Sequence, residues 1–268
     1  MENLSGTGLR ALFKELHHAE APLVLPNAWD YASAAALVSA GFSAVGTTSL
    51  GVAAAAGKPD AEAATAAETL ALAETLARLP CPVTVDLEGG FGRAEELAVR
   101  LSELGIAGVN LEDGGLADPA ELCAMIRRVK ESAPDLFVNA RTDTFWLAAP
   151  RPLESALERV RAYAEAGADG VFVPAITADD DIAAVVAAVD VPVNVLFMPG
   201  RHTVAGLAEL GVRRISMGSL LFRAALGAAV RTASAVRDGA AIEGGAPSYE
   251  EVNSLVSPRA SRPAGGPR

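Results

Sequence analysis

Short apolar runs alternate along the chain with longer segments of helical period. Eight runs predict strands, at Leu23–Ala28, Ala44–Thr48, Val83–Glu88, Gly108–Glu112, Phe137–Asp143, Gly170–Pro174, Val193–Phe197 and Arg214–Gly218. Helices are predicted between and after them, at Tyr31–Ser39, Ala61–Arg78, Arg93–Leu104, Pro119–Ser132, Pro152–Ala166, Ala178–Val189, Val204–Leu210 and Leu220–Arg237. A further helix, Gly6–His18, precedes the first strand, and several helices end on a glycine, such as Gly105 and Gly167.

Eight strand–helix units in succession favour an α/β fold, a (β/α)8 TIM barrel, which usually takes about 250 residues. An open doubly wound sheet would show fewer strands and, for a dinucleotide, a glycine-rich turn after the first strand, but Pro26–Asp30 contains no glycine. We therefore predict one barrel domain over residues 1–243. Residues 244–268 are rich in Pro, Gly, Ser and Arg and predict a flexible tail with a weak helix at Ser248–Val256.

Side chains alternate across a strand, and the alternation sorts three of the predicted strands into apolar and polar faces. The apolar faces, such as Val85 and Leu87, suit the surface beneath the helices. The polar faces then point into the barrel toward the carboxyl ends of adjacent strands, and they carry Asp86, Glu88, Glu112, Arg141 and Asp143. Barrels of this type keep their active sites at that end.

Three carboxylates, those of Asp86, Glu88 and Glu112, are expected to converge there. Carboxylates cannot gather in a partly buried site without compensation, and a hard divalent cation such as Mg²⁺, or Mn²⁺, is one solution. Satisfaction by arginines and backbone donors is the alternative. Arg141 can bind a substrate carboxylate or phosphonate through paired hydrogen bonds, or pair with the carboxylates, and the two roles are compatible.

The long loop after the second predicted strand supplies further candidates. Thr48, Ser49 and Leu50 offer hydroxyls and backbone N–H groups that can bind an anionic group of a substrate. Asp60, later in the loop, can reach the water shell of a metal ion. It can also cap the alanine-rich helix that follows, or do both.

The charge, the apolar stretches and the cysteines of the chain limit the binding partners and the cellular location that we expect. The 268 residues include 33 acidic and 22 basic side chains, a net charge of −11, which argues against nucleic acid and anionic membranes. No stretch reaches the roughly 18 apolar residues of a membrane span, and the N-terminus lacks the apolar core of a signal peptide. Cys81 and Cys123 show no metal or redox spacing, which predicts a reducing, cytoplasmic location.

The few lysines and histidines of the chain limit the classes of reaction that it could catalyse. The chain has three lysines, none on a predicted strand, so a Schiff-base aldolase is not expected. His17 and His18 are predicted surface residues of the first helix. His202 follows the seventh strand and is an acid–base candidate or simply a helix-start residue. Tyr31, near the pocket mouth, is a second catalytic candidate, and Asn194 on the seventh strand is a candidate for substrate binding.

Five motifs in order resemble the isocitrate lyase/phosphoenolpyruvate mutase superfamily over about residues 20–225. They are Asn27-Ala28-Trp29-Asp30, Thr48-Ser49-Leu50-Gly51 leading to Gly57-Lys58-Pro59-Asp60, Asp86-Leu87-Glu88-Gly89-Gly90-Phe91-Gly92, Asn110-Leu111-Glu112-Asp113 and Asn139-Ala140-Arg141-Thr142-Asp143. The resemblance implies a (β/α)8 barrel whose last helix is swapped onto a partner, giving a homodimer or homotetramer. It also implies Mg²⁺ held by carboxylates, largely through water, and an enolate of a 2-oxo acid stabilised by the metal.

The resemblance also implies residue roles. Asp86 matches the main metal carboxylate, Glu88 stands where many members have Asp, and Glu112 matches the acidic residue of the fourth strand. Asp60 matches the loop aspartate near the metal. The Thr48–Leu50 segment would cradle the substrate carboxylate, and Arg141 would grip the substrate.

The loop after the fourth strand, Gly114–Pro119, departs from the family pattern. It lacks the Cys, Lys and His of isocitrate and methylisocitrate lyases and the Lys and Asn of the mutases. We expect a Mg²⁺-dependent carbon–carbon lyase or decarboxylase of a small 2-oxo or 2-hydroxy acid. Phosphonopyruvate hydrolase- or mutase-like P–C chemistry and a non-catalytic barrel that binds a small acid are alternatives. Asp118, His202 and Tyr31 are the candidates for the catalytic acid.

Overall fold

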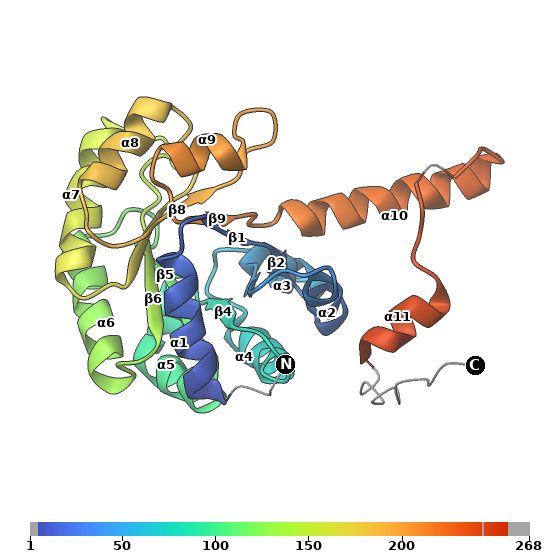
Figure 1. The fold of residues 1–268 in the computed structure, drawn as a ribbon, viewed down its shortest axis with the longest axis horizontal. Helices are drawn as coiled ribbons and strands as arrows, with labels where there is room; N and C mark the ends of the chain where they lie inside the picture. The colour runs from blue at the N-terminus through green and yellow to red at the C-terminus, as the bar shows by residue number, and fades with distance from the viewer. Residues whose placement is uncertain (1–4, 243, 257–268) are drawn as a thin grey trace, which may run out of the picture.

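The strands run parallel and follow one another around a barrel, as the computed structural model, which describes residues 5–242 and 244–256, shows (Figure 1). They are β1 (Leu23–Leu25), β2 (Asn27–Ala28), β3 (Val45–Thr47), β4 (Val83–Asp86), β5 (Gly108–Glu112), β6 (Phe137–Arg141), β7 (Gly170–Val173), β8 (Val193–Leu196) and β9 (Arg214–Ser216). Helices alternate with these strands. The α/β barrel predicted from the sequence is therefore confirmed.

The first predicted strand is broken at Pro26, and this break closes the barrel. Pro26 has no backbone N–H to donate to a neighbouring strand. The segment before it, β1, pairs with β9, whereas the segment after it, β2, pairs with β3. The side chain of Asn27 reinforces the closure, because its Nδ2 donates to the carbonyl of Thr47 at 2.8 Å and its Oδ1 accepts from the N–H of Met217 at 3.0 Å.

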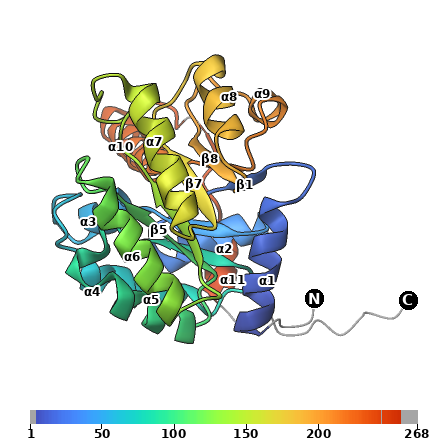
Figure 2. The ribbon, with the colours of Figure 1, turned by 90° about the vertical axis from the view of Figure 1, so that its left-hand side faces the viewer.

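Helices cover the outside of the barrel (Figure 2). Before β6 they are α1 (Gly6–His17), α2 (Tyr31–Ser39), α3 (Ser49–Ala55), α4 (Ala66–Leu76), α5 (Ala94–Glu103) and α6 (Pro119–Ser132), with a 3-10 turn at Gly90–Gly92. After β6 they are α7 (Pro152–Glu165), α8 (Asp179–Ala187), α9 (Val204–Glu209), α10 (Leu220–Asp238) and α11 (Tyr249–Val256). Gly105 and Gly167, which follow α5 and α7, have φ values of 85° and 103°, the left-handed conformation expected there.

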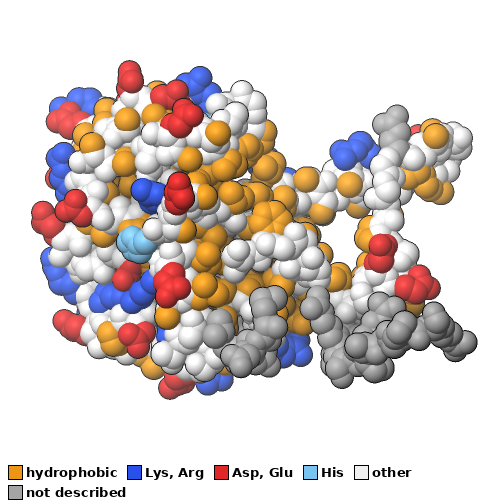
Figure 3. All heavy atoms as spheres, in the orientation of Figure 1, with side chains coloured by type: hydrophobic (Ala, Val, Ile, Leu, Met, Phe, Trp, Pro, Cys, Tyr) orange, Lys and Arg blue, Asp and Glu red, His pale blue; other side chains and the backbone are white. Residues whose placement is uncertain are grey.

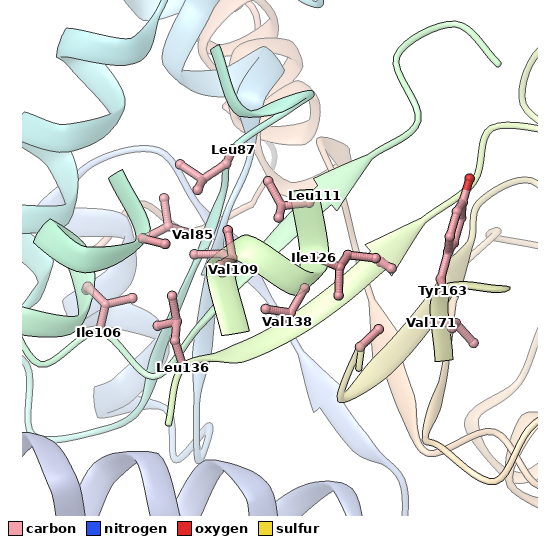
Figure 4. Close-up of a cluster of buried hydrophobic side chains, with 14 of the residues drawn as sticks. Val85, Leu87, Ile106, Val109, Leu111, Ile126, Leu136, Val138, Tyr163 and Val171 are labelled. Atoms are coloured by element: carbon pink, nitrogen blue, oxygen red, sulfur yellow. The ribbon is translucent and has the colours of Figure 1, made fainter. Parts of the chain in front are cut away.

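The main apolar core lies between the strands and the helices. Val85, Val109, Leu111 and Val138 are buried and face the helical layer, where Ile126 of α6 packs against the same cluster (Figure 4). These are the side chains that the strand alternation assigns to the helical side. The polar side chains between them therefore face the interior of the barrel.

A second apolar group closes the N-terminal end of the barrel. We call it the basal cluster; it consists of Phe13, Leu23, Leu25, Ala44, Ala107 and Phe137. His17 lies one helical turn after Phe13, and its ring stacks on Phe137 with 4.3 Å between ring centroids. His17 is only 1% exposed, so its prediction as a surface residue is wrong, because α1 turns the face carrying Phe13 and His17 inward. His18 is exposed, as predicted.

The segment after β3 differs from the prediction. The expected loop contains the short helix α3, and the helix predicted from Ala61 begins only at Ala66. Ala61 and Ala63 adopt left-handed backbone angles, with φ of 60° and 51°, which interrupt a right-handed helix. Thr65 occupies the cap position of α4, so the hypothesis that Asp60 caps this helix is wrong.

The C-terminal helices leave the barrel and return to it. Phe222 at the start of α10 packs edge-on against Trp29, 5.3 Å between ring centroids, and the helix then extends away from the barrel (Figure 1). The weak helix expected at residues 248–256 is present as α11, which packs against α2. Residues 257–268 of the predicted tail lie outside the described residues. Within the described ranges, no helix has the length and apolar character needed to cross a membrane.

Candidate active site

Asp86 stands at the carboxyl end of β4, where three neighbouring segments hold it. Its backbone N–H donates to the hydroxyl of Thr47 at the end of β3, at 2.9 Å. Its carboxylate accepts from the N–H of Glu88 at 3.3 Å, and the backbone N–H of Ser49 in α3 also donates to it. The carboxylate is therefore fixed at the meeting point of β3, α3 and β4.

Arg141 connects two acidic side chains at the ends of β5 and β6. Its Nη1 lies 2.8 Å from Oε2 of Glu112, its direct neighbour in the strand register, and its Nε donates to Oδ1 of Asp143 at 2.7 Å. All three side chains are largely buried. The structure thus shows the ion pair that was one of the two roles considered for Arg141, and substrate binding stays a prediction.

Glu88 lies where the strand alternation no longer applies. Because β4 ends at Asp86 and Glu88 has a left-handed φ of 49°, its side chain does not continue the inward row. Its carboxylate instead accepts from the hydroxyl of Thr65 at 3.0 Å and from the N–H of Ala63 at 3.2 Å. Glu88 is thereby tied to the segment that follows Asp60.

The carboxylates at this end of the barrel act on one another. We call them the acid cluster: Asp60, Asp86, Glu88, Glu112 and Asp143. Burial, reinforced by the neighbouring carboxylates, raises the pKa of Asp86, Glu88 and Asp143. Burial raises the pKa of Glu112 to about 8, against the opposing charge of Arg141. Burial therefore disfavours the charged forms of these carboxylates, and a cation bound among them would stabilise those forms.

Residues of the acid cluster fit a hydrated divalent cation. Oδ1 of Asp60 is buried and has no hydrogen-bond partner among the described residues, and the charge of Asp60 acts directly on Asp86. As the side chains stand, no three Asp, Glu, His or Cys residues of the described ranges are close enough to hold one ion together. Mg²⁺ usually takes one or two carboxylates and completes its shell with water. The donor set therefore suits an ion bound through few direct contacts.

The Thr48–Leu50 segment forms the start of α3 and borders the acid cluster, because the N–H of Ser49 donates to Asp86. Thr48 is buried at the cap position of α3, and its N–H donates to the carbonyl of Ala28 at 3.2 Å. A Cβ on Gly51 would come within 2.8 Å of side-chain atoms of both Thr48 and Trp29, so the close approach requires glycine. Ser49 and Leu50 are partly exposed.

Two of the candidates for the catalytic acid make structural contacts away from the acid cluster. The ring of Tyr31 lies under the guanidinium of Arg78, 5.0 Å from its centroid, and packs with the main core. The carboxylate of Asp118 is exposed and caps α6 by accepting from the N–H of Ala120 at 2.9 Å. The structure therefore does not bring these two side chains into the acid cluster.

His202 and Asn194 are both buried. Nδ1 of His202 accepts from the N–H of Met198 at 3.2 Å, which closes the turn after β8. Its Nε2 has no partner within the described residues, and burial lowers its pKa, so the ring is neutral near pH 7. Asn194 faces the barrel interior beside Arg214 of β9, and both of its amide atoms lack a described partner. The roles predicted for these two residues stay predictions.

Two residues that shape the site were not among the sequence candidates. Asp143 could have been chosen, because it follows Arg141 by two positions and shares its side of the predicted strand. Thr65 gives no such signal, since its contact with Glu88 depends on the left-handed turns at Ala61 and Ala63.

Comparison with known proteins decides the family. A family model described as phosphoenolpyruvate phosphomutase matches residues 13–237, most of the chain. The chain belongs to the isocitrate lyase/phosphoenolpyruvate mutase superfamily. It is an enzyme of this superfamily, whose members include lyases and mutases, which sets aside the non-catalytic alternative.

Three relatives illustrate the range of this superfamily. An uncharacterised protein of Mycobacterium tuberculosis is 44% identical over 248 residues, 91% of this chain and 95% of that protein. The 2-methylisocitrate lyase of Bacillus subtilis is 33% identical over 189 residues, 65% of this chain and 62% of that enzyme. The crystal structure of a putative phosphonomutase from Burkholderia cenocepacia is 40% identical, with a TM-score of 0.78 over 83% of this chain and 97% of that one.

Proposed function

We propose that this protein is a Mg²⁺-dependent carbon–carbon lyase or decarboxylase that acts on a small 2-oxo or 2-hydroxy carboxylic acid. The observation that carries the proposal is the acid cluster beside Arg141 at the carboxyl end of the barrel. Its gathered carboxylates offer the oxygen ligands that a divalent cation takes, and Arg141 favours an anionic substrate. The likeness to a 2-methylisocitrate lyase supports a C–C bond as the one that breaks.

The residues of the site divide the work. Asp86 would hold the cation, with Asp60, Glu88 and Glu112 contacting it through water. When bound, Mg²⁺ or Mn²⁺ supplies the positive charge that favours an enolate over the 2-oxo acid. Arg141 would exchange part of its pairing with Glu112 for the substrate carboxylate, which the backbone N–H groups of the Thr48–Leu50 segment would also approach.

Protonation of the enolate needs a donor. With Nδ1 accepting a hydrogen bond, the neutral ring of His202 carries its proton on Nε2, which has no partner among the described residues. We therefore favour His202 over Tyr31 and Asp118 as the acid. His202→Gln should then lower turnover and leave the affinity for Mn²⁺ unchanged; a loss of Mn²⁺ affinity instead would assign His202 a different role.

A P–C enzyme is the second candidate, because the 40% identical structure is that of a putative phosphonomutase. Against it, Gly114–Pro119 carries neither the lysine nor the asparagine expected of a mutase. One assay separates the two candidates. The protein is incubated with Mg²⁺ and oxaloacetate, 2-methylisocitrate or phosphonopyruvate, with EDTA and no-enzyme controls, and both pyruvate and phosphoenolpyruvate are quantified. Pyruvate from either of the first two acids supports the lyase or decarboxylase, and pyruvate or phosphoenolpyruvate from phosphonopyruvate alone supports the P–C enzyme. Formation of neither product from any of the three acids contradicts both.

We also propose that α10 joins two copies into a homodimer, or a homotetramer of such pairs. Leu226 and Val230 lie one turn apart on this helix and are 52% and 66% exposed. In Figure 3, apolar side chains gather at the base of the arm that α10 forms and recur along it. Light scattering should show an oligomer for the wild type and a monomer for Leu226→Glu/Val230→Glu; a monomeric wild type would contradict the proposal.

The cytoplasm is the proposed location. Cys81 and Cys123 are both buried free thiols, which fits a reducing compartment. Fractionation of cells that express the full chain tests this, and recovery from a secreted fraction would contradict it.

A further inference from the structure

A fully buried carboxylate lies just behind the site, on Asp113, which directly follows Glu112. Its side chain has no solvent exposure. Arg159 of α7 donates to it at 2.8 Å, the hydroxyl of Tyr163 at 3.0 Å, and the backbone N–H of Asp143 at 3.2 Å. We call Asp113, Arg159 and Tyr163 the Asp113 network.

Arg159 also holds the loop after β5. The same guanidinium donates to the carbonyl of Ala117 at 2.9 Å and to that of Leu116 at 3.3 Å. The N–H of Ala117 donates in turn to the carbonyl of Asp113 at 2.9 Å. The loop Gly114–Asp118 is therefore bound from behind by α7 and along its own backbone.

Such an arrangement resists opening. Moving the loop would break the Arg159 contacts with Leu116 and Ala117, and moving Arg159 would leave the charge of Asp113 buried and unpaired. In Figure 4 the hydroxyl of Tyr163 lies at the end of the ring away from Val171, so the rest of the ring stays in the apolar core. The network is thus anchored in the packed part of the barrel.

The Asp113 network also reaches the site. Oδ1 of Asp113 accepts from the backbone N–H of Asp143, and the side chain of Asp143 accepts from Nε of Arg141. The backbone position of Asp143 is therefore set from behind, and the orientation of Arg141 depends on it.

We propose that the Asp113 network makes the loop Gly114–Asp118 a fixed wall of the site, not a lid, and positions Arg141 through Asp143. The fixed wall goes beyond the proposed function and holds whatever the reaction. The positioning of Arg141 rests on the proposed function. Arg159 and Tyr163 are positioning residues, since neither contacts Arg141 itself.

Amide hydrogen exchange tests the wall without any substrate. In Arg159→Met, the amides of Ala117 and Asp143 should exchange about tenfold faster or more than in the wild type. Local opening of the variant no longer has to break the hydrogen bonds of Arg159, so it costs less free energy. The amide of Val171, bonded to the carbonyl of Pro192 at 3.0 Å, should keep its rate. Arg161→Met, an exposed arginine on the same helix, is the matched control and should change none of the three.

Tyr163→Phe keeps the buried ring and removes only the hydroxyl that donates to Asp113. It therefore tests the same network if Arg159→Met does not fold. Its Ala117 and Asp143 amides should exchange faster by a smaller factor, about two- to fivefold. Rates equal to those of the wild type in a folded Arg159→Met and in Tyr163→Phe would overturn the fixed wall. Equal acceleration at Val171 would overturn it too, because it would indicate global loosening.

Steady-state kinetics test the positioning of Arg141. Tyr163→Phe should raise KM for the acid more than it lowers kcat, since the displaced group binds substrate. An unchanged KM together with faster amide exchange in the loop would overturn the positioning of Arg141, while the proposal that the loop is a fixed wall would stand. If no acid is turned over by the wild type, the proposed function fails while the exchange result still stands.

Discussion

The two ends of the barrel are built by the same strands but bury opposite chemistry. At the N-terminal end, residues of β1, residues at or just before the starts of β3, β5 and β6, and Phe13 of α1 form the basal cluster, which is apolar and closed. At the carboxyl end, the last residues of β4, β5 and β6 are Asp86, Glu112 and Arg141, and the acid cluster stays partly accessible. The comparison teaches that one end is built for stability and the other for binding charge.

A polar layer separates the two ends. Arg214 of β9 is 1% exposed and donates to Oδ1 of Asn110 at 3.1 Å, and Asn139 donates to the same oxygen at 2.9 Å. Burial lowers the pKa of Arg214 to about 9, and the charge of Asp86 acts against that shift. The buried guanidinium of Arg214 thus offsets part of the negative charge of the acid cluster, from the side that faces the basal cluster.

The largest expected effect is at the charged end. Asp86→Asn should lower kcat/KM by roughly 100- to 1,000-fold, because the neutral amide no longer stabilises the cation. Since burial raises the pKa of Asp86, the charged form is disfavoured in the fold, and the variant should be as stable as the wild type or more stable. Activity assays and urea unfolding measure both quantities. Asp180→Asn, on the exposed start of α8, should leave both unchanged. Full activity in Asp86→Asn would contradict the assignment of catalysis to the acid cluster at the carboxyl end.

The opposite pattern is expected at the closed end. Phe13 is fully buried, so Phe13→Ala should lower the free energy of unfolding by about 3–5 kcal/mol through lost burial and a residual cavity. At temperatures where the variant stays folded, kcat should change little. Leu12→Ala, at a partly exposed position of the same helix, should cost clearly less. A fall in kcat with unchanged stability would show that the closed end takes part in catalysis.

Arg141→Lys should have an intermediate effect at the charged end. Lysine keeps the charge but loses the planar fork that binds Glu112 and Asp143 together, so kcat/KM should fall by roughly 10- to 100-fold, chiefly through KM. Arg151→Lys, whose arginine is exposed, is the control. If kcat falls and KM does not, Arg141 acts on the reaction step and not on substrate binding.

The effect that is smallest near neutral pH is a pH dependence of the free energy of unfolding at the closed end. Burial, with a contribution from Arg214, lowers the pKa of His17 to about 3, against an ordinary value of 6.5. The unfolded chain therefore binds a proton below pH 6.5 that the folded chain refuses, and stability falls as pH drops from 6.5 toward 3. The loss from this group reaches at most about 1.4 kcal/mol per pH unit. His17→Gln should lack this share of the slope in thermal unfolding, and His18→Gln should keep it. Identical slopes in all three proteins would contradict the burial of His17.

The sequence predicted those features that lie inside regular elements. Asp86, Glu112 and Arg141 are the last residues of β4, β5 and β6, so strand alternation placed them on the inner face. His17 was within reach of the same reasoning, because it continues the buried helical spacing through Leu9 and Phe13. The surface that buries it, which includes Phe137 at the N-terminal end of the barrel, becomes visible only in three dimensions.

The features that escaped prediction depend on turns with left-handed backbones. Ala61, Ala63 and Glu88 all have positive φ, and none of these residue types indicates such a conformation. These turns end the strand before Glu88 and delay α4, which decides where Asp60 and Glu88 lie. The Asp113 network escaped for another reason, since it joins side chains more than 40 residues apart.

The central claim is that the acid cluster binds a divalent cation, and anomalous diffraction from crystals soaked in Mn²⁺ tests it most directly. We predict a strong anomalous peak at the carboxyl end of the barrel beside Asp86, and its absence from crystals of Asp86→Asn. A wild-type crystal with no peak at Asp86, or a peak that persists in Asp86→Asn, would contradict the account.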